Sequence, residues 1–257
     1  MIMPGKPILA IIGGTGTSEM EGFVEERRTE ISTPWGSPSA PLRWGHLFGT
    51  RIVFLARHGD RHALAPHQVN YRANLWAIDS AGARSVVALA AVGGITSAME
   101  PGSVVVPDQL IDYTYGRAQT FSDGEGGKDP VRHVDFTDPY DEGIRNWLIA
   151  GARRADLPRI ERATYGVTQG PRLETRQEIR RMEQDGCDIV GMTSMPEAAL
   201  ARELGLSYAC CALVSNWAAG KGIRPIHDEL EESLRQALAR TRLILEAALT
   251  TPLPERP

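Results

Sequence analysis

The sequence predicts an α/β fold in which a mixed, mostly parallel β-sheet is flanked by helices. Short β-branched, apolar runs alternate with longer helical patterns along the chain, and this alternation is typical of βαβ units. Several of the short runs are apolar throughout, as expected for strands that helices cover on both faces. The 257 residues, 42% of them hydrophobic, suffice for one large core. We therefore expect a single domain over residues 1–257, with its core over about 8–249.

The strands are predicted from apolar, β-branched runs that are bounded by glycine, proline or polar residues. The first of them ends in a glycine-rich turn, and the others are spread along the whole chain. The predicted strands are Pro7–Ile12, Arg51–Ala56, Ser85–Val92, Ser103–Pro107, Ala163–Thr168, Asp188–Met192 and Tyr208–Ser215.

The helices are predicted from longer segments with apolar residues at helical spacing. The fourth also has end signals: Thr193 and Ser194 are candidate caps, Pro196 lies in the first turn and Gly205 follows the end. The predicted helices are Pro66–Ala81, Tyr140–Ala155, Glu174–Asp185, Met195–Leu204 and Asp228–Leu249.

The segment from Tyr115 to Pro130 is polar and rich in Gly, Asp and Ser, which predicts a long loop that is either mobile or ordered by a partner.

Composition and charge exclude several classes of protein. The net charge is −4 and no long Lys/Arg run occurs, so nothing favours binding to nucleic acid or to an anionic membrane. No apolar run approaches the roughly 20 residues that span a bilayer. Cys187, Cys210 and Cys211 lie in apolar segments without zinc-type spacing, which indicates buried free thiols and no metal site. We expect a cytoplasmic protein.

A glycine-rich turn follows the first predicted strand. In Gly13-Gly14-Thr15-Gly16, the glycines allow close approach of an anion and the Thr15 hydroxyl adds a donor. A P-loop would continue with Gly-Lys-Ser/Thr, and a dinucleotide fingerprint would place a third glycine near position 19, where Glu19 stands. An ordinary structural corner is the alternative interpretation, since such turns are common.

Groups that suit phosphate follow three further strands. Arg57 and His58 follow the second, and they offer a planar guanidinium fork and an imidazole donor. Ala91 lies near the end of the next strand, before Val92-Gly93-Gly94, and offers its backbone N–H. Thr193 lies at a predicted helix N-terminus, where the dipole favours an anion. A surface Arg and a satisfied His are the alternative for the dipeptide alone. Because the carboxyl ends of parallel strands meet at one crevice, the repetition predicts a phosphate site.

Five motifs together resemble, in order and spacing, the trimeric purine nucleoside phosphorylase and methylthioadenosine phosphorylase family, from about Ile8 to Leu249. The resemblance implies a phosphorylase/hydrolase-like α/β fold, a homotrimer, inorganic phosphate as co-substrate and no cofactor. It also implies that Thr15, Arg57, His58, Ala91 and Thr193 bind phosphate and that Met192 packs under the ribose. The motifs are Ile12–Gly16, Ala56–Gly59, Val69–Asn74, Gln169–Thr175 and Met192–Glu197.

Two side chains indicate which purine is bound. Ionised Glu174 can only accept a hydrogen bond, so it matches the N1–H of a 6-oxopurine and opposes the bare N1 of adenine. Asn216 can donate to O6 while accepting from a protonated N7. In the family, adenine-type enzymes have a small hydroxyl residue and Asp at these places, and a second Asp where this chain has Ala218. A helix-capping Glu174 and a turn-forming Asn216 are the alternatives.

One position and one neighbouring-subunit residue bear on the sugar. Ile226 stands ten residues after Asn216, where the inosine enzymes place a histidine for the 5′-hydroxyl, and an apolar residue there fits a 5′-methylthio group. His227 is adjacent, and a register shifted by one residue would reverse the preference. His133 resembles a residue that the family contributes to the sugar site of the adjacent subunit, so the active sites of the trimer would be shared.

The combination predicts phosphorolysis of S-methyl-5′-thioinosine to hypoxanthine and 5-methylthioribose 1-phosphate, with Asn216, Glu174 and His58 as the catalytic residues. Methylthioadenosine phosphorylase and inosine/guanosine phosphorylase are the alternatives within the class, and a non-catalytic nucleoside sensor is the alternative outside it.

Overall fold

The computed structural model describes residues 8–17, 20–122, 131–158, 160–223 and 226–254, without the side chains of 226–229. Its strands form one sheet with the order β2-β3-β4-β1-β5-β9-β8-β7, and β10 pairs with β5 and β6. The strands are β1 Ile8–Gly13, β2 Phe23–Thr29, β3 Leu42–Leu47, β4 Thr50–Ala56, β5 Ala83–Gly94, β6 Val104–Val105, β7 Gln109–Asp112, β8 Thr164–Val167, β9 Ile189–Gly191 and β10 Ser207–Trp217.

The pairings β4–β1–β5–β10 and β7–β8–β9 are parallel, whereas β2–β3–β4, β5–β9 and β6–β10 are antiparallel. The predicted mixed, mostly parallel sheet is therefore confirmed. In β5 every residue except Arg84 and Ala91 is buried, which agrees with a strand enclosed by neighbours on both faces.

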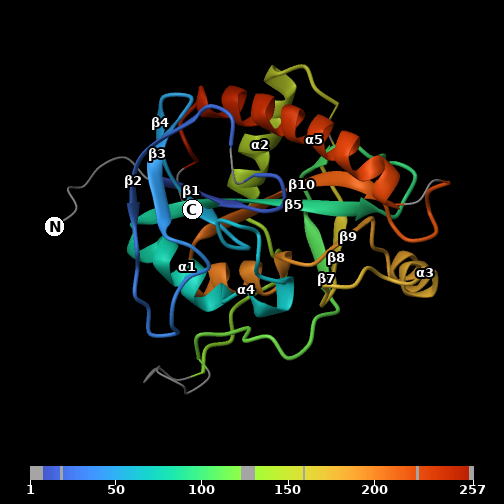
Figure 1. Ribbon diagram of the computed structural model, residues 1–257, viewed down its shortest axis with the longest axis horizontal. Coiled ribbons are helices and arrows are strands. Elements are labelled where there is room, and N and C mark those ends of the chain that lie inside the picture. The colour runs from blue at the N-terminus through green and yellow to red at the C-terminus, as the bar shows by residue number, and fades with distance from the viewer. Residues whose placement is uncertain (1–7, 18–19, 123–130, 159, 224–225, 255–257) are drawn as a thin grey trace.

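Helices cover both faces of the sheet. In Figure 1, α2 and α5 lie on one side of β5 and β10, α1 and α4 lie on the other, and α3 stands beside β7–β9. The helices are α1 Tyr71–Ser80, α2 Glu142–Arg154, α3 Arg176–Gln184, α4 Ser194–Leu204 and α5 Ile226–Leu249.

Three strands were not predicted from the sequence. β2 reads Phe-Val-Glu-Glu-Arg-Arg-Thr and is mostly exposed at the edge of the sheet, so its charged side chains hide the strand pattern. β3 and β7 mix polar with apolar residues in the same way. These strands are stabilised by hydrogen bonds to their neighbouring strands, which local composition does not reveal.

The predicted helix over 66–81 is divided in two. A short 3₁₀ turn covers Pro66–Gln68, and α1 begins after Asn70, whose side chain accepts from the backbone N–H of Ala73. At the end of α4, Gly205 has a φ of 67° and forms the left-handed cap that was predicted.

The described part of the polar loop is anchored. The backbone N–H of Phe121 donates to Glu203 Oε2 (2.8 Å), and the Phe121 ring packs edge-on against Trp35. The loop thus lies over the α1/α4 side of the molecule as far as residue 122, while 123–130 lie outside the described residues.

Candidate active site

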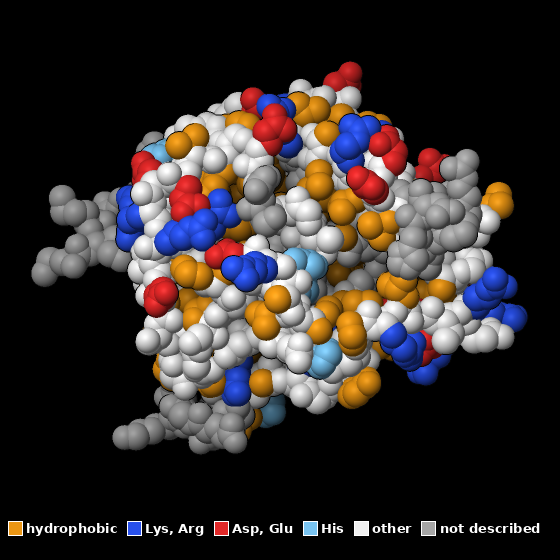
Figure 2. All heavy atoms as spheres, in the orientation of Figure 1, with side chains coloured by type: hydrophobic (Ala, Val, Ile, Leu, Met, Phe, Trp, Pro, Cys, Tyr) orange, Lys and Arg blue, Asp and Glu red, His pale blue; other side chains and the backbone are white. Residues whose placement is uncertain are grey.

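A cavity of about 440 Å³ lies where the carboxyl ends of the central strands meet the chain before α4. Figure 2 shows histidine side chains among hydrophobic ones near the middle of one face of the molecule. Predicted site residues from both the phosphate and the nucleoside sets line this one cavity: Thr15, Arg57, His58, Ala91, Thr193, Met192, Glu174, Asn216 and Ala218. The fold therefore brings together groups as far apart in the sequence as Thr15 and Ala218.

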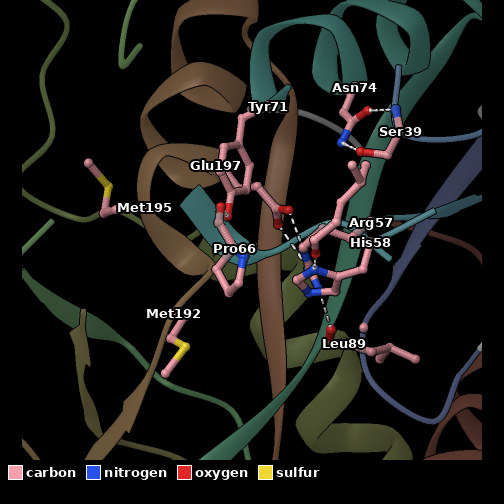
Figure 3. A network of polar contacts seen from close by, with 12 residues as sticks. Ser39, Arg57, His58, Pro66, Tyr71, Asn74, Leu89, Met192, Met195 and Glu197 are labelled. Carbon is pink, nitrogen blue, oxygen red and sulfur yellow. Dashed lines mark hydrogen bonds and ion pairs between the residues drawn. The ribbon is translucent and has the colours of Figure 1, made fainter. Parts of the chain in front are cut away.

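Arg57 forms a buried ion pair with Glu197 (Figure 3). Its Nε donates to Glu197 Oε1, its Nη2 to Glu197 Oε2 (3.0 Å) and its Nη1 to the carbonyl of Leu89 (2.8 Å). Burial lowers the pKa of the guanidinium. The charge and hydrogen bonds of Glu197 raise this pKa by more, so its net value lies well above the ordinary one. One N–H on each terminal nitrogen remains for an oxygen in the cavity.

Glu197 is itself fixed by Tyr208. The Tyr208 hydroxyl donates to Glu197 Oε2 at 2.9 Å, and burial raises the pKa of that hydroxyl, so it keeps its proton. Sequence reasoning missed Glu197 as a functional residue, although it ends one of the family motifs. The only signal was a carboxylate beside the apolar run Ala198–Ala201 in the first half of the helix, where an unpaired charge is expensive.

His58 is held by its own loop. Its Nδ1 lies 2.8 Å from the carbonyl of Leu64, and because a carbonyl can only accept, Nδ1 carries the proton. Burial and the positive charge of Arg57 lower the pKa of His58 to about 4, which leaves the ring neutral near pH 7. Its Nε2 is then an acceptor toward the cavity, whereas the sequence suggested a further donor.

This pKa predicts how the fold responds to acid. The unfolded chain protonates His58 near its ordinary pKa of 6.5, and the folded chain does so only near about 4. Between these values the unfolded state binds more protons, so the free energy of unfolding falls as the pH falls through this window. Urea unfolding from about pH 7 to about pH 4 measures the slope. His58→Asn keeps a donor for Leu64 and does not titrate, so it is expected to flatten the slope; equal slopes would contradict the assignment.

Two threonines and a second histidine complete the phosphate end. Thr193 is the residue before α4, its hydroxyl makes no capping bond, and this buried side chain lines the cavity. Thr15 Oγ1 lies 3.4 Å from His62 Nε2, and the rings of His62 and His58 are 4.6 Å apart. His62 therefore contacts both Thr15 and His58 from an exposed turn and lines the cavity, although the sequence prediction did not include it.

Close contacts around position 14 require a glycine there. A Cβ there would lie 2.6 Å from the Leu89 carbonyl oxygen and 2.9 Å from Arg57 Nη1. We expect Gly14→Ala to separate these two groups and to raise the KM for phosphate about 10-fold, the lower end of what a hydrogen bond to a charged group contributes. Steady-state kinetics with phosphate varied measures it. Gly143→Ala in the first turn of α2 is the control, and an unchanged phosphate KM in Gly14→Ala would refute the expectation.

Glu174 lies at the other end of the cavity with one oxygen already bonded. Thr168 Oγ1 donates to Glu174 Oε1 at 2.6 Å, which leaves Oε2 as the free acceptor. The cap of α3 is Thr175, which forms a capping box with Glu178, so the alternative of a helix-capping Glu174 is wrong. Thr168 was not predicted as a site residue, because its role depends on the fold of the loop between it and Glu174.

The side-chain amide of Asn216 can still both donate and accept a hydrogen bond in the cavity. Its Oδ1 accepts from Ser215 Oγ and its Nδ2 donates to the carbonyl of Trp217, each at 2.8 Å. One N–H and one lone pair remain toward the cavity. Asn216 belongs to β10, at a register shift against β5, so the alternative of a turn-forming Asn is also wrong.

The remaining predicted residues divide between those in the cavity wall and those outside it. Ala218 is buried and Met192 half-buried, and both line the cavity. His133 is exposed and does not line the cavity of its own chain. Ile226 begins α5, but its side chain lies outside the described residues.

Two features are absent from the described residues. Among them, no group of three or more His, Cys, Asp or Glu side chains could hold a metal ion. In the same part of the chain, none of the helices combines the length and the apolar character that crossing a bilayer requires.

Comparison with known proteins gives consistent matches over nearly the whole chain. The chain is 55% identical to a probable S-methyl-5′-thioinosine phosphorylase of Xylella fastidiosa, over 83% of this chain and 86% of the relative. It is 44% identical to the 6-oxopurine nucleoside phosphorylase of Pyrococcus furiosus, over 90% and 87%. Methylthioadenosine phosphorylase from Schistosoma mansoni in complex with adenine superposes with a TM-score of 0.88 at 33% identity, covering 95% and 91% of the two chains. Residues 8–250 match the family model, and the chain belongs to the phosphorylase superfamily.

Proposed function

We propose that this protein catalyses the phosphorolysis of S-methyl-5′-thioinosine to hypoxanthine and 5-methylthioribose 1-phosphate. The observation that carries the proposal is one cavity with a buried, oriented arginine at one end and the pair Glu174 and Asn216 at the other. The names of relatives at 49–55% identity support the same substrate.

At the phosphate end, the two free N–H groups of Arg57 and the hydroxyls of Thr15 and Thr193 hold phosphate below C1′ of the sugar, with Ala91 contributing backbone. Neutral His58 accepts the hydrogen of a P–OH group at Nε2, since hydrogen phosphate carries one such hydrogen. The phosphate charge then faces the positive charge that develops on the ribosyl ring as the glycosidic bond breaks. Inorganic phosphate is the only co-substrate that this chemistry needs.

At the base end, Asn216 supports the leaving group. Its free N–H donates to O6, and its free lone pair accepts from N7 once that nitrogen takes up, by way of solvent, the one proton that hydrogen phosphate releases as its oxygen bonds C1′. The free oxygen of Glu174 accepts from N1–H. The Asn216 contact to O6 strengthens as electrons move into the purine and so favours departure of the base, whereas the Glu174 contact selects a base that carries N1–H.

At the sugar, Met192 packs under the ribose. Leu230 and Leu234 of α5 add an apolar wall beside the turn after β1, which agrees with a 5′-methylthio group. Ile226 extends this wall in the proposal, and His133 serves the sugar site of an adjacent subunit in a homotrimer. The mass in solution tests the trimer. The expected location in the cytoplasm stays a prediction.

One assay tests the function. The protein is incubated with phosphate and, in separate reactions, with methylthioinosine, methylthioadenosine and inosine, and release of the base is followed. We expect the highest kcat/KM with methylthioinosine. Preference for methylthioadenosine would overturn the roles of Glu174 and Asn216, preference for inosine would overturn the 5′ pocket, and no turnover of any of them would leave a nucleoside sensor.

A further inference from the structure

Arg117 lies outside the cavity wall, yet it contacts the segment under the sugar. Its Nη1 donates to the carbonyl of Met192 at 2.8 Å and to the carbonyl of Met195 at 2.6 Å. Met195 interrupts the helical backbone at the start of α4 with φ −112° and ψ 134°, so its carbonyl is turned out of the helix. The guanidinium satisfies backbone groups that the irregular entry into α4 leaves without an intrahelical partner.

The same guanidinium contacts the segment that carries the base-recognition residue. Its Nη2 donates to the carbonyls of Thr168 (3.1 Å) and Gln169 (2.8 Å), and its Nε donates to Gln169 Oε1 (3.0 Å). Thr168 in turn donates from its hydroxyl to Glu174 Oε1. One side chain thus reaches Glu174 through a single intermediate residue.

Arg117 is held between these segments by Tyr71. The guanidinium carbon lies 5.5 Å from the centre of the Tyr71 ring, and Nη1 lies 3.4 Å from the Tyr71 hydroxyl. That hydroxyl donates to the carbonyl of Pro66. The planar fork of an arginine is needed, because a lysine ammonium cannot reach carbonyls on two separate segments in this geometry.

We propose that Arg117 is a positioning residue for the nucleoside: it locks the end of β8 to the entry of α4 and thereby fixes Glu174 and Met192 at the spacing of one base and one ribose. This inference rests on the proposed function. Among the described contacts Arg117 bonds none of the side chains of Arg57, His58 and Thr193, and the carbonyl that it holds before Thr193 belongs to Met192, so we expect its effect to be largest at the nucleoside end of the cavity.

The test compares Arg117→Lys and Arg117→Met with Arg84→Ala. Arg84 is the control because it also donates to a backbone carbonyl, together with Asp79, at the start of β5 and far from the carboxyl ends. For both Arg117 variants we expect the KM for the nucleoside to rise at least about 10-fold. The KM for phosphate should stay within about twofold, and the preference for methylthioinosine over methylthioadenosine should decrease. A purely structural role would lower the active fraction and leave both KM values unchanged.

An unchanged nucleoside KM, or an equal rise of both KM values, would overturn the inference. Arg117→Lys keeps the charge and most of the volume, so it carries the test if Arg117→Met does not fold. Equilibrium binding of hypoxanthine gives a readout that does not require turnover. If the unaltered protein binds hypoxanthine but turns over no nucleoside, the proposed function fails while Arg117→Lys still tests the positioning role.

Discussion

Glu197→Gln is expected to lose about 3–5 kcal/mol of unfolding free energy, because it leaves the fully buried Arg57 charge without its partner. The guanidinium also loses the carboxylate that orients Nε and Nη2, so kcat should fall about 10- to 100-fold, the range for a lost charged hydrogen bond. Added phosphate supplies the missing negative charge. We therefore expect phosphate to raise the unfolding free energy more in the variant than in the unaltered protein.

Urea unfolding with and without phosphate measures both effects. The double variant Arg57→Met, Glu197→Met separates stability from chemistry, since replacing both partners of a buried pair by apolar side chains is often neutral for stability. The double variant should regain much of the unfolding free energy that Glu197→Gln loses, but it should have no activity. A loss below about 1 kcal/mol in Glu197→Gln, or an equal response to phosphate, would show that the pair does not hold Arg57 in place.

Asn216→Asp is expected to shift the preference from the 6-oxopurine toward the 6-aminopurine nucleoside. The carboxylate has no N–H for O6 but can accept from the 6-amino group of adenine. A mispaired buried polar group costs about 1–3 kcal/mol, so kcat/KM for methylthioinosine should fall about 5- to 150-fold relative to methylthioadenosine. The ratio of the two kcat/KM values is the measurement.

Asn146→Asp on the exposed side of α2 makes the same chemical change away from the cavity and should leave the ratio unaltered. If Asn216→Asp lowers turnover of both nucleosides by the same factor, then Asn216 supports the leaving group without selecting it. Because Glu174 remains in this variant, a full reversal of preference is expected only when Glu174 is also replaced by Ser.

The sequence by itself determined the central layer of the fold. β1, β4, β5 and β10 are continuous apolar runs, and burial on both faces demands such runs whatever the rest of the chain does. The candidate ligands were found for a related reason. Arg57 directly follows β4, and the parallel strands β4, β1 and β5 bring their carboxyl ends to one edge. Thr193 lies two residues after β9, which is antiparallel to β5, so its place at the same cavity follows from the tertiary structure. The family motifs added Glu174 and Asn216, whose hydrogen-bonding capacities depend only on residue type.

Only the tertiary structure decided the residues that hold those ligands. Glu197 pairs with Arg57 across 140 positions, and Arg117 bonds carbonyls 51 to 78 positions away. The proton position on His58 depends on where the Leu64 carbonyl lies, and the charged strand β2 forms because β3 supplies its partners. Periodicity and local composition indicate which residues of a single segment are buried and where that segment ends in a turn. Pairing between distant polar groups leaves no such local record, because its free energy arises only once the fold has removed water from around them.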